Sequence, residues 1–211
     1  IEPFIIDGRR IKSINQFYNK HKAELQSSLE KNKKFSKRIQ HLTNKRNFKI
    51  LNYLHKASKF IVNQAVSNAL NTIVIGYNKG WKQETNLGKK TNQNFVQIPF
   101  EKLVQLISYK AKLQGIQVFL QEESYTSQVS FLEGDYIPTF KKDDSKKNPS
   151  GKRIKRGLYS SPKGLLNADI NGSLNILRNF LASNNKDFNS PVGKSHVDWP
   201  VRIKNPQRIK L

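Results

Sequence analysis

Hydrophobic residues recur along much of the first half of the chain at the three- and four-residue spacing of a helix. A sparse apolar stripe predicts a long, basic helix over residues 13–45, which Ser13 can cap. A denser stripe predicts a second helix over residues 48–69, which Asn47 can begin. We expect the first helix to pack through one narrow face and the second through a broad one.

Two short apolar runs in the middle of the chain predict strands. Residues 72–76 form an all-apolar run, typical of a buried parallel strand, and residues 116–120 form the next one. Between them, residues 100–113 have the pattern of an amphipathic helix that begins after Pro99. The order strand, helix, strand predicts half of an α/β sheet with a right-handed crossover.

The remaining segments lack this periodicity. Residues 1–12 predict an extended piece followed by a turn at Asp7 and Gly8, where Asp7 is interpreted as a turn residue rather than a ligand. Residues 124–166 carry Gly, Pro, Ser and a Lys-rich turn, which indicates a compact or mobile insertion. Residues 183–211, with their prolines and polar residues, predict an irregular or disordered tail.

The charge of the chain points to a polyanionic partner. Its 211 residues include 38 Lys and Arg against 15 Asp and Glu, a net charge of +23. Such a field concentrates nucleic acid, and the basic residues are spread along the chain rather than confined to one amphipathic helix. No run is long enough to span a membrane, so no membrane partner is expected. The absence of cysteine excludes disulfides and thiolate zinc sites.

Two stretches are candidate nucleic-acid contacts. The loop after residues 72–76 places Trp81 among lysines and amides, a composition that suits a nucleotide strand. The basic residues are expected to contact mainly phosphate. The candidates are Lys79, Trp81 and Lys82 in this loop, and Lys152, Arg153, Lys155 and Arg156 in the insertion.

Three acidic residues stand where metal-dependent chemistry could use them. Asp169 lies in the first turn of a predicted helix over residues 167–182, where the helix dipole favours a charged carboxylate. Glu122 and Glu123 follow the strand predicted over residues 116–120. Carboxylates at a strand end and at a helix start are what a two-metal nuclease requires. An acidic helix start without a ligand role is the plain alternative.

Several motifs occur in an order that resembles a known family. A strand is followed by Tyr-Thr-Ser-Gln, and a later helix opens with Ala-Asp-Ile-Asn and continues with Asn-Ile-Leu. Together they resemble the C-terminal half of TnpB, the transposon-encoded OrfB family related to type V CRISPR effectors. The resemblance extends from about residue 4 to about residue 180. The stretches that carry it are 53–58, 73–83, 92–96, 125–128, 168–171 and 175–177.

The resemblance implies an α/β, ribonuclease-H-like (RuvC-like) mixed sheet with flanking helices. The chain would then contain a core that is incomplete at its N-terminus, an insertion in the place of the family's zinc ribbon, a closing helix and a tail. These parts correspond to residues 1–123, 124–166, 167–182 and 183–211.

The resemblance also implies an RNA-guided DNA endonuclease of the bacterial cytoplasm, associated with the nucleoid, whose partners are a guide RNA and target DNA. Cleavage would use two Mg²⁺ ions. Asp169 would be the third catalytic acid and a metal ligand, and either Glu122 or Glu123 would be the second. Of the two glutamates, Glu122 is preferred at this point because it lies nearer the strand end.

Two departures from the family pattern affect these expectations. The places that match the family's four zinc cysteines lie near Ser130, Glu133, Ser160 and Lys163, so no structural zinc is expected. The family's first catalytic Asp lies on a strand shortly before a segment like residues 3–8, so we expect this chain to lack that acid and to be inactive alone.

Three functions therefore stay open: a piece of an RNA-guided endonuclease, a nuclease-dead protein that binds guide RNA or DNA, and an RNA-binding α/β protein with structural acids. The net charge fits all three. Neutralising Asp169 should abolish cutting in the first, leave binding intact in the second and alter only stability in the third.

Overall fold

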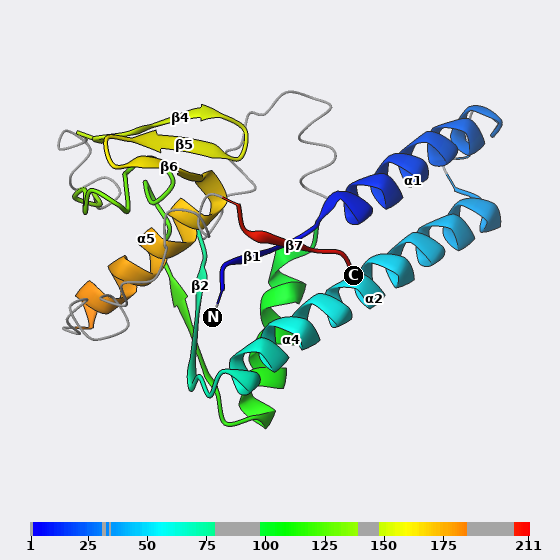
Figure 1. Ribbon diagram of the computed structural model, residues 1–211. Coiled ribbons are helices and arrows are strands. Elements are labelled where there is room, and N and C mark those ends of the chain that lie inside the picture. The colour runs from blue at the N-terminus through cyan, green and yellow to red at the C-terminus, as the bar shows by residue number, and fades with distance from the viewer. Residues whose placement is uncertain (1, 31–32, 34, 79–97, 139–147, 185–204) are drawn as a thin grey trace. The chain divides into compact units, whose positions relative to one another are not determined.

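The computed structural model describes residues 2–30, 33, 35–78, 98–138, 148–184 and 205–211 (Figure 1). They form two compact units, each assembled from segments that are far apart in the sequence. The sheet unit comprises Ile1–Ile5, Thr72–Lys79 and Gln117–Arg208, and the helical unit comprises Ile6–Asn71, Gly80–Ile116 and Ile209–Leu211. The sequence-based division, in contrast, followed contiguous ranges.

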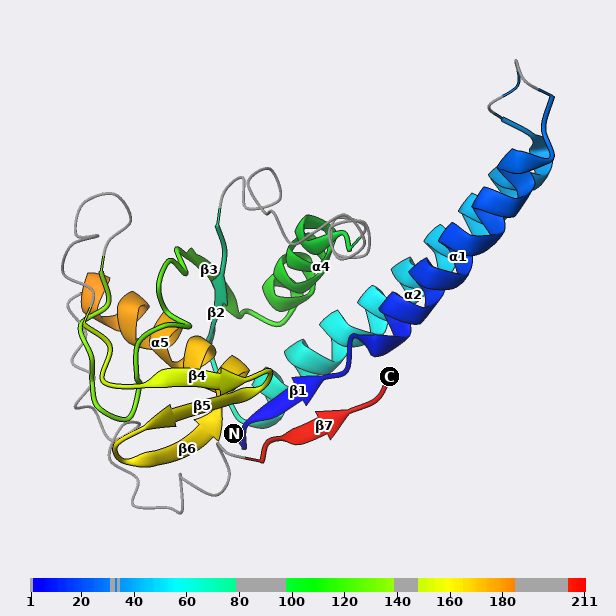
Figure 2. The same ribbon diagram turned by 90° about the horizontal axis from the view of Figure 1, so that it is seen from above.

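The described part of the helical unit contains three helices. Helix α1 (Arg9–Ser27) and helix α2 (Lys37–Ser67) run side by side as a hairpin in both Figure 1 and Figure 2. Helix α4 (Phe100–Leu113) packs against α2 and has the bounds that the sequence predicted. The core between them is a cluster of buried apolar side chains, in which Leu54 of α2 is only 2% exposed. No helix among the described residues is both long and apolar enough to cross a membrane.

Helix α1 begins four residues earlier than predicted, because Asp7 rather than Ser13 holds its first turn. The Asp7 carboxylate accepts a hydrogen bond from the backbone N–H of Arg9 (3.0 Å) and pairs with the Arg9 guanidinium (2.5 Å). Ser13 lies inside the helix and donates to the carbonyl of Arg9. Asp7 therefore has the local structural role that the sequence indicated.

The predicted break between the first two helices is wrong, because it lies at residues 28–36 and not after residue 45, so that residues 37–45 belong to the second helix. Helix α1 ends at Ser27, and α2 begins at Lys37. The hydroxyl of Ser36 accepts a hydrogen bond from the backbone N–H of Ile39 (3.2 Å), which satisfies a donor that the helix start would leave unpaired. Asn47, predicted to begin the second helix, lies inside α2.

The sheet unit contains the two strands that the apolar runs predicted. Strand β2 (Thr72–Gly76) pairs in parallel with strand β3 (Gln117–Gln121), with Gly76 opposite Gln121. Helix α5 (Ala168–Ser183) packs against both strands. The parallel pairing is confirmed, and β3 is shifted by one residue from its predicted bounds.

The described part of the insertion is compact. Strands β4 (Lys152–Lys155), β5 (Leu158–Ser161) and β6 (Gly164–Asn167) form an antiparallel sheet in that order (Figure 1). Tyr159 and Leu166 are fully buried beneath it, and β6 continues directly into α5.

The tail contains a strand where the sequence predicted irregular chain. Strand β7 (Gln207–Ile209) pairs with strand β1 (Phe4–Ile6), and the backbone N–H of Asp7 donates to the carbonyl of Ile209 (2.9 Å). The described strands thus form three small sheets in a mixed α/β structure. A pairing between segments about 200 residues apart leaves no local signal in the sequence.

Candidate functional site

The two candidate glutamates directly follow strand β3 but occupy different environments. Glu122 is exposed, and its carboxylate accepts a hydrogen bond from the hydroxyl of Ser124 (2.6 Å). Glu123 is partly buried, and its backbone N–H donates to the side-chain oxygen of Asn78 (3.2 Å), two residues beyond β2. Glu123 is therefore held between the ends of the two parallel strands.

Gly76, the last residue of β2, makes room for Glu123. A Cβ atom on Gly76 would lie 2.6 Å from a carboxylate oxygen of Glu123 and 2.5 Å from the terminal carbon of Ile176 on α5. Real Cβ atoms essentially never come that close to another heavy atom. The end of β2, the Glu123 side chain and helix α5 therefore meet at Gly76, where a larger residue would displace the end of the Glu123 or Ile176 side chain.

Burial raises the pKa of the Glu123 carboxyl above its usual range. Removal from water disfavours the charged form, and a bound cation would offset this effect. Partly buried carboxyls with raised pKa values are common at functional sites. The shift thus distinguishes Glu123 from a solvent-facing surface acid.

Replacing Glu123 by Gln should raise the free energy of unfolding near neutral pH, because the variant buries no charge. The folded protein holds the Glu123 proton more tightly than the unfolded chain does. The contribution of the protonated Glu123 to stability is therefore fully present below the unfolded pKa of about 4.3, and it is lost as the pH rises through the folded pKa. The advantage of Glu123→Gln should therefore grow between about pH 4 and about pH 7 in urea unfolding.

Glu122→Gln is the matched control for this measurement, because Glu122 is exposed. As a substitution of an exposed side chain, it should change the free energy of unfolding by no more than about 0.5 kcal/mol. An advantage of Glu123→Gln that stays constant across the pH range would contradict the assigned burial effect.

Asp169 lies in the first turn of α5 and faces solvent. Asn167 caps the helix, and its side-chain oxygen accepts hydrogen bonds from the backbone N–H groups of Asp169 (2.9 Å) and Ile170 (3.3 Å). The Asp169 side chain is 67% exposed, and the guanidinium of Arg153 on β4 lies 3.9 Å from its carboxylate. A charged, accessible carboxylate at a helix N-terminus is available to a cation.

Asp169 and Ile176, the α5 residue that lies beside Gly76, fall on nearly the same side of α5. Asp169 precedes Ile176 by seven residues, which is about two helical turns or about 10 Å along the axis and nearly the same angular position. Gly172, between them, lies against Ser127, with 3.9 Å from its Cβ position to the Ser127 Cα. The segment that follows Glu123 therefore lies against α5 at Gly172, one turn after Asp169.

The donors present are of the type that Mg²⁺ prefers, since carboxylate oxygens are its usual protein ligands. All three candidate acids belong to the sheet unit. Within the described residues, however, no three His, Cys, Asp or Glu side chains gather closely enough to hold a metal ion. Two carboxylates together with substrate phosphates are a common way to bind Mg²⁺.

Two asparagines of α5, Asn171 and Asn175, are completely buried. The Asn171 side chain accepts a hydrogen bond from the backbone N–H of Phe131 (3.0 Å) and donates to the carbonyl of Val129 (2.8 Å). Asn175 donates to the carbonyls of Thr126 (2.8 Å) and Val129 (3.0 Å). The two amides fasten the segment after Glu123 to α5. Their spacing of four residues, around Gly172, was the only signal in the sequence.

The structure describes some of the residues that were predicted to contact nucleic acid. Lys152, Arg153 and Lys155 lie on β4, an exposed edge strand of the insertion sheet, and Arg156 follows it. Arg153 is the one of these that forms an ion pair with Asp169. The other predicted contacts, Lys79, Trp81 and Lys82, lie outside the described residues.

Polar contacts join the positions that match the family's zinc cysteines. The Ser130 hydroxyl accepts from the backbone N–H of Glu133 (3.4 Å), and the Glu133 carboxylate accepts from the backbone N–H of Lys163 (2.8 Å). The Lys163 ammonium lies 3.5 Å from the same carboxylate. These contacts connect the turn at residues 130–133 to the turn between β5 and β6.

Two sequence families match the chain. OrfB_IS605, described as a probable transposase, matches residues 1–82, and the Cas12f1-like TNB domain matches residues 100–176. No curated protein has a significantly similar sequence.

Among solved structures, the fold is similar to that of Cas12f1 in a cryo-EM structure of its complex with sgRNA and target DNA. The TM-score is 0.56 and the sequence identity 20%, over 81% of this chain and 42% of the Cas12f1 chain. The chain thus spans about two fifths of the length of that protein. With the two family matches following one another along most of its length, the chain belongs to the TnpB/OrfB family of transposon-associated proteins.

Proposed function

We propose that the chain is the C-terminal, catalytic part of an RNA-guided DNA endonuclease with a ribonuclease-H-like, RuvC-like domain. The family membership and the similarity to Cas12f1 support this reading. The observation that carries it is the partly buried Glu123 carboxylate at the end of β2, beside Ile176 of α5, the helix whose first turn contains Asp169. By the same reasoning the partners would be a guide RNA and target DNA.

Glu123 is proposed as the second catalytic acid in preference to Glu122. Its carboxylate lies at the end of β2 beside α5, whereas the Glu122 carboxylate is exposed and accepts a hydrogen bond from Ser124. Glu123 and Asp169 would hold Mg²⁺. When bound, the metal polarises the scissile phosphate and lowers the pKa of the attacking water.

The other residues of the chain position these acids and the substrate. Asn171 and Asn175 fix the segment that follows Glu123, and Asn167 fixes the helix start that carries Asp169. Arg153, beside Asp169 on an exposed strand, would bind a phosphate of the DNA strand close to the acids.

The chain alone is expected not to cut DNA. A two-metal site needs three or four carboxylates from different elements, and the described residues offer two that suit the roles. The test is Mg²⁺-dependent cleavage of a guide-matched plasmid by the 211-residue chain, compared with the chain extended by an opening strand that carries the family's first Asp. Clear cutting by the chain alone would contradict the prediction.

The second candidate function is a nuclease-dead protein that binds guide RNA or DNA. It is favoured by the finding that no three metal-binding side chains gather within the described residues. In that case the extended chain would bind nucleic acid with the same affinity before and after Asp169→Asn, and it would not cut in either form.

A further inference from the structure

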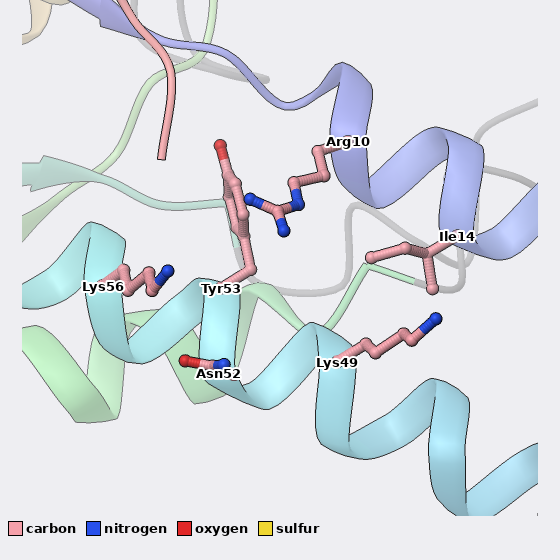
Figure 3. Close-up of a pocket in the computed structure, with 6 residues that line it drawn as sticks. All are labelled: Arg10, Ile14, Lys49, Asn52, Tyr53 and Lys56. Atoms are coloured by element: carbon pink, nitrogen blue, oxygen red, sulfur yellow. The ribbon is translucent and has the colours of Figure 1, made fainter.

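We propose that the groove between α1 and α2 binds a single-stranded nucleic acid, with its phosphates on a row of cations and a base on Phe17. Figure 3 shows the centre of this groove, a cavity of about 170 Å³ in the helical unit. Arg10 reaches it from α1, and Lys49 and Lys56 reach it from α2, with Tyr53 between them. Three cations thus surround one cavity.

The cations of α2 form a row rather than a random distribution. Helix α2 contains seven Lys and Arg residues and no Asp or Glu along its 31 residues. Lys45, Lys49 and Lys56 follow at spacings of four and seven residues, which places them on one face of the helix. Such a row of like charges is unfavourable alone and is stabilised by a polyanion that follows it.

Within the part of the chain that the structure describes, acidic side chains do not neutralise this row. Asp7, the acid closest in sequence to Arg10, pairs through its carboxylate with Arg9 and accepts the Tyr53 hydroxyl on its backbone carbonyl (2.6 Å). Arg10 donates to the carbonyl of Leu211 through one guanidinium nitrogen (2.6 Å). Among the described residues, no Asp or Glu forms an ion pair with Lys49 or Lys56.

The groove continues along the helices past Phe17. A second cavity of about 280 Å³ shares Ile14 and Lys49 with the first and is also lined by Phe17 and Lys45. The Phe17 side chain is 56% exposed, and its ring stacks on His21 with 3.9 Å between the ring centroids. An exposed ring beside a row of lysines is the arrangement that binds unpaired bases by stacking.

The exposed ring of Phe17 favours a single strand over a duplex as the ligand of the groove. In a duplex the base faces are stacked on one another, so Phe17 could contribute nothing, whereas a single strand offers both phosphates and free base faces. RNA and DNA strands share this chemistry. The inference rests on the proposed nucleic-acid function, but the groove lies in the helical unit and the candidate acids lie in the sheet unit.

The first test removes charge from the groove. Lys49→Gln with Lys56→Gln is compared with Lys12→Gln with Lys112→Gln, which removes the same charge from the same unit outside both cavities. The probes are an RNA and a DNA 20-mer of one mixed sequence, followed by fluorescence anisotropy over a range of salt. Losing two phosphate contacts should lower the salt slope by about 1.4 and weaken low-salt binding about tenfold. An equal loss in the control variant would overturn the site.

The second test removes the ring. Phe17→Ala should weaken binding of the single strands about tenfold and leave a duplex of the same sequence unaffected. Phe48→Ala is the matched control, since Phe48 is 71% exposed on α2 and lines neither cavity of the groove. Unchanged single-strand binding, or an equal loss for the duplex, would overturn the stacking role. The strand that binds more tightly, RNA or DNA, identifies the natural source.

These readouts separate the groove from the catalytic proposal, because they measure binding and not cutting. Intact groove binding with no cleavage by the extended chain would contradict the proposed nuclease alone. Cleavage that depends on Asp169, with binding indifferent to Lys49 and Lys56, would contradict the groove alone.

Discussion

Asp169→Asn and Glu123→Gln are each expected to reduce Mg²⁺-dependent cleavage by the extended chain at least about a hundredfold. The metal ions supply several kcal/mol of transition-state stabilisation, and each 1.36 kcal/mol corresponds to about a tenfold change in rate. Loss of one carboxylate removes a ligand and a negative charge from a site that has few of either. The measurement is the single-turnover rate of cutting a guide-matched plasmid.

Glu122→Gln is the matched control, because it makes the same change one residue away on an exposed side chain. It should retain nearly the full rate. If Glu122→Gln abolishes cutting and Glu123→Gln does not, the second acid is Glu122, as its proximity to the strand end first indicated. Binding of single-stranded RNA should be the same in all three variants, which separates loss of chemistry from loss of partner.

Asn171→Ala is expected to lower the free energy of unfolding by about 2–4 kcal/mol. The variant removes the Asn171 oxygen that accepts from the part-buried backbone N–H of Phe131 and opens a small cavity beside Val129. The Val129 carbonyl still accepts a hydrogen bond from Asn175 in this variant, so it does not add to the loss of stability as an unpaired group. The measurement is urea unfolding of the 211-residue chain.

Ser173→Ala is the control within the same helix, since Ser173 is exposed and donates only to the carbonyl of Ile170. It should change the stability by no more than about 0.5 kcal/mol. Asn171→Asp keeps an acceptor for Phe131 but buries a carboxylate against the Val129 carbonyl, so its loss of stability near neutral pH should be at least as large as that of Asn171→Ala. A loss of unfolding free energy for Asn171→Ala as small as that for Ser173→Ala would contradict the role of Asn171 in holding residues 129–131 against α5.

The hydrogen bonds of Asn171 and Asn175 also connect the stability of the fold to the proposed catalysis. Residues 126–131 follow Glu123 directly, and their carbonyl and N–H groups are held by Asn171 and Asn175. Displacement of a catalytic group by about 1 Å can reduce a rate about a hundredfold. Asn171→Ala is therefore expected to slow cutting by the extended chain even where the protein remains folded.

The sequence by itself determined the elements whose signal is local. The apolar runs gave strands β2 and β3 as a parallel pair, and the amphipathic pattern after Pro99 gave α4 with its correct bounds. Such patterns succeed because side-chain periodicity follows directly from backbone geometry. The positions of Glu122, Glu123 and Asp169 at a strand end and a helix start were likewise readable, and so was the family from its ordered motifs.

The tertiary structure decided what depends on distant contacts. The start of α2 depends on Ser36, one of several serines that could cap a helix, and β7 forms only because β1, about 200 residues away, offers a partner. The burial of Asn171 and Asn175 follows from the backbone groups of residues 126–131 that they meet. Glu123 differs from Glu122 because Gly76 and Ile176 surround it. Adjacent identical residues carry the same local signal, and only the neighbours brought by folding set the solvation and hydrogen bonding that distinguish them.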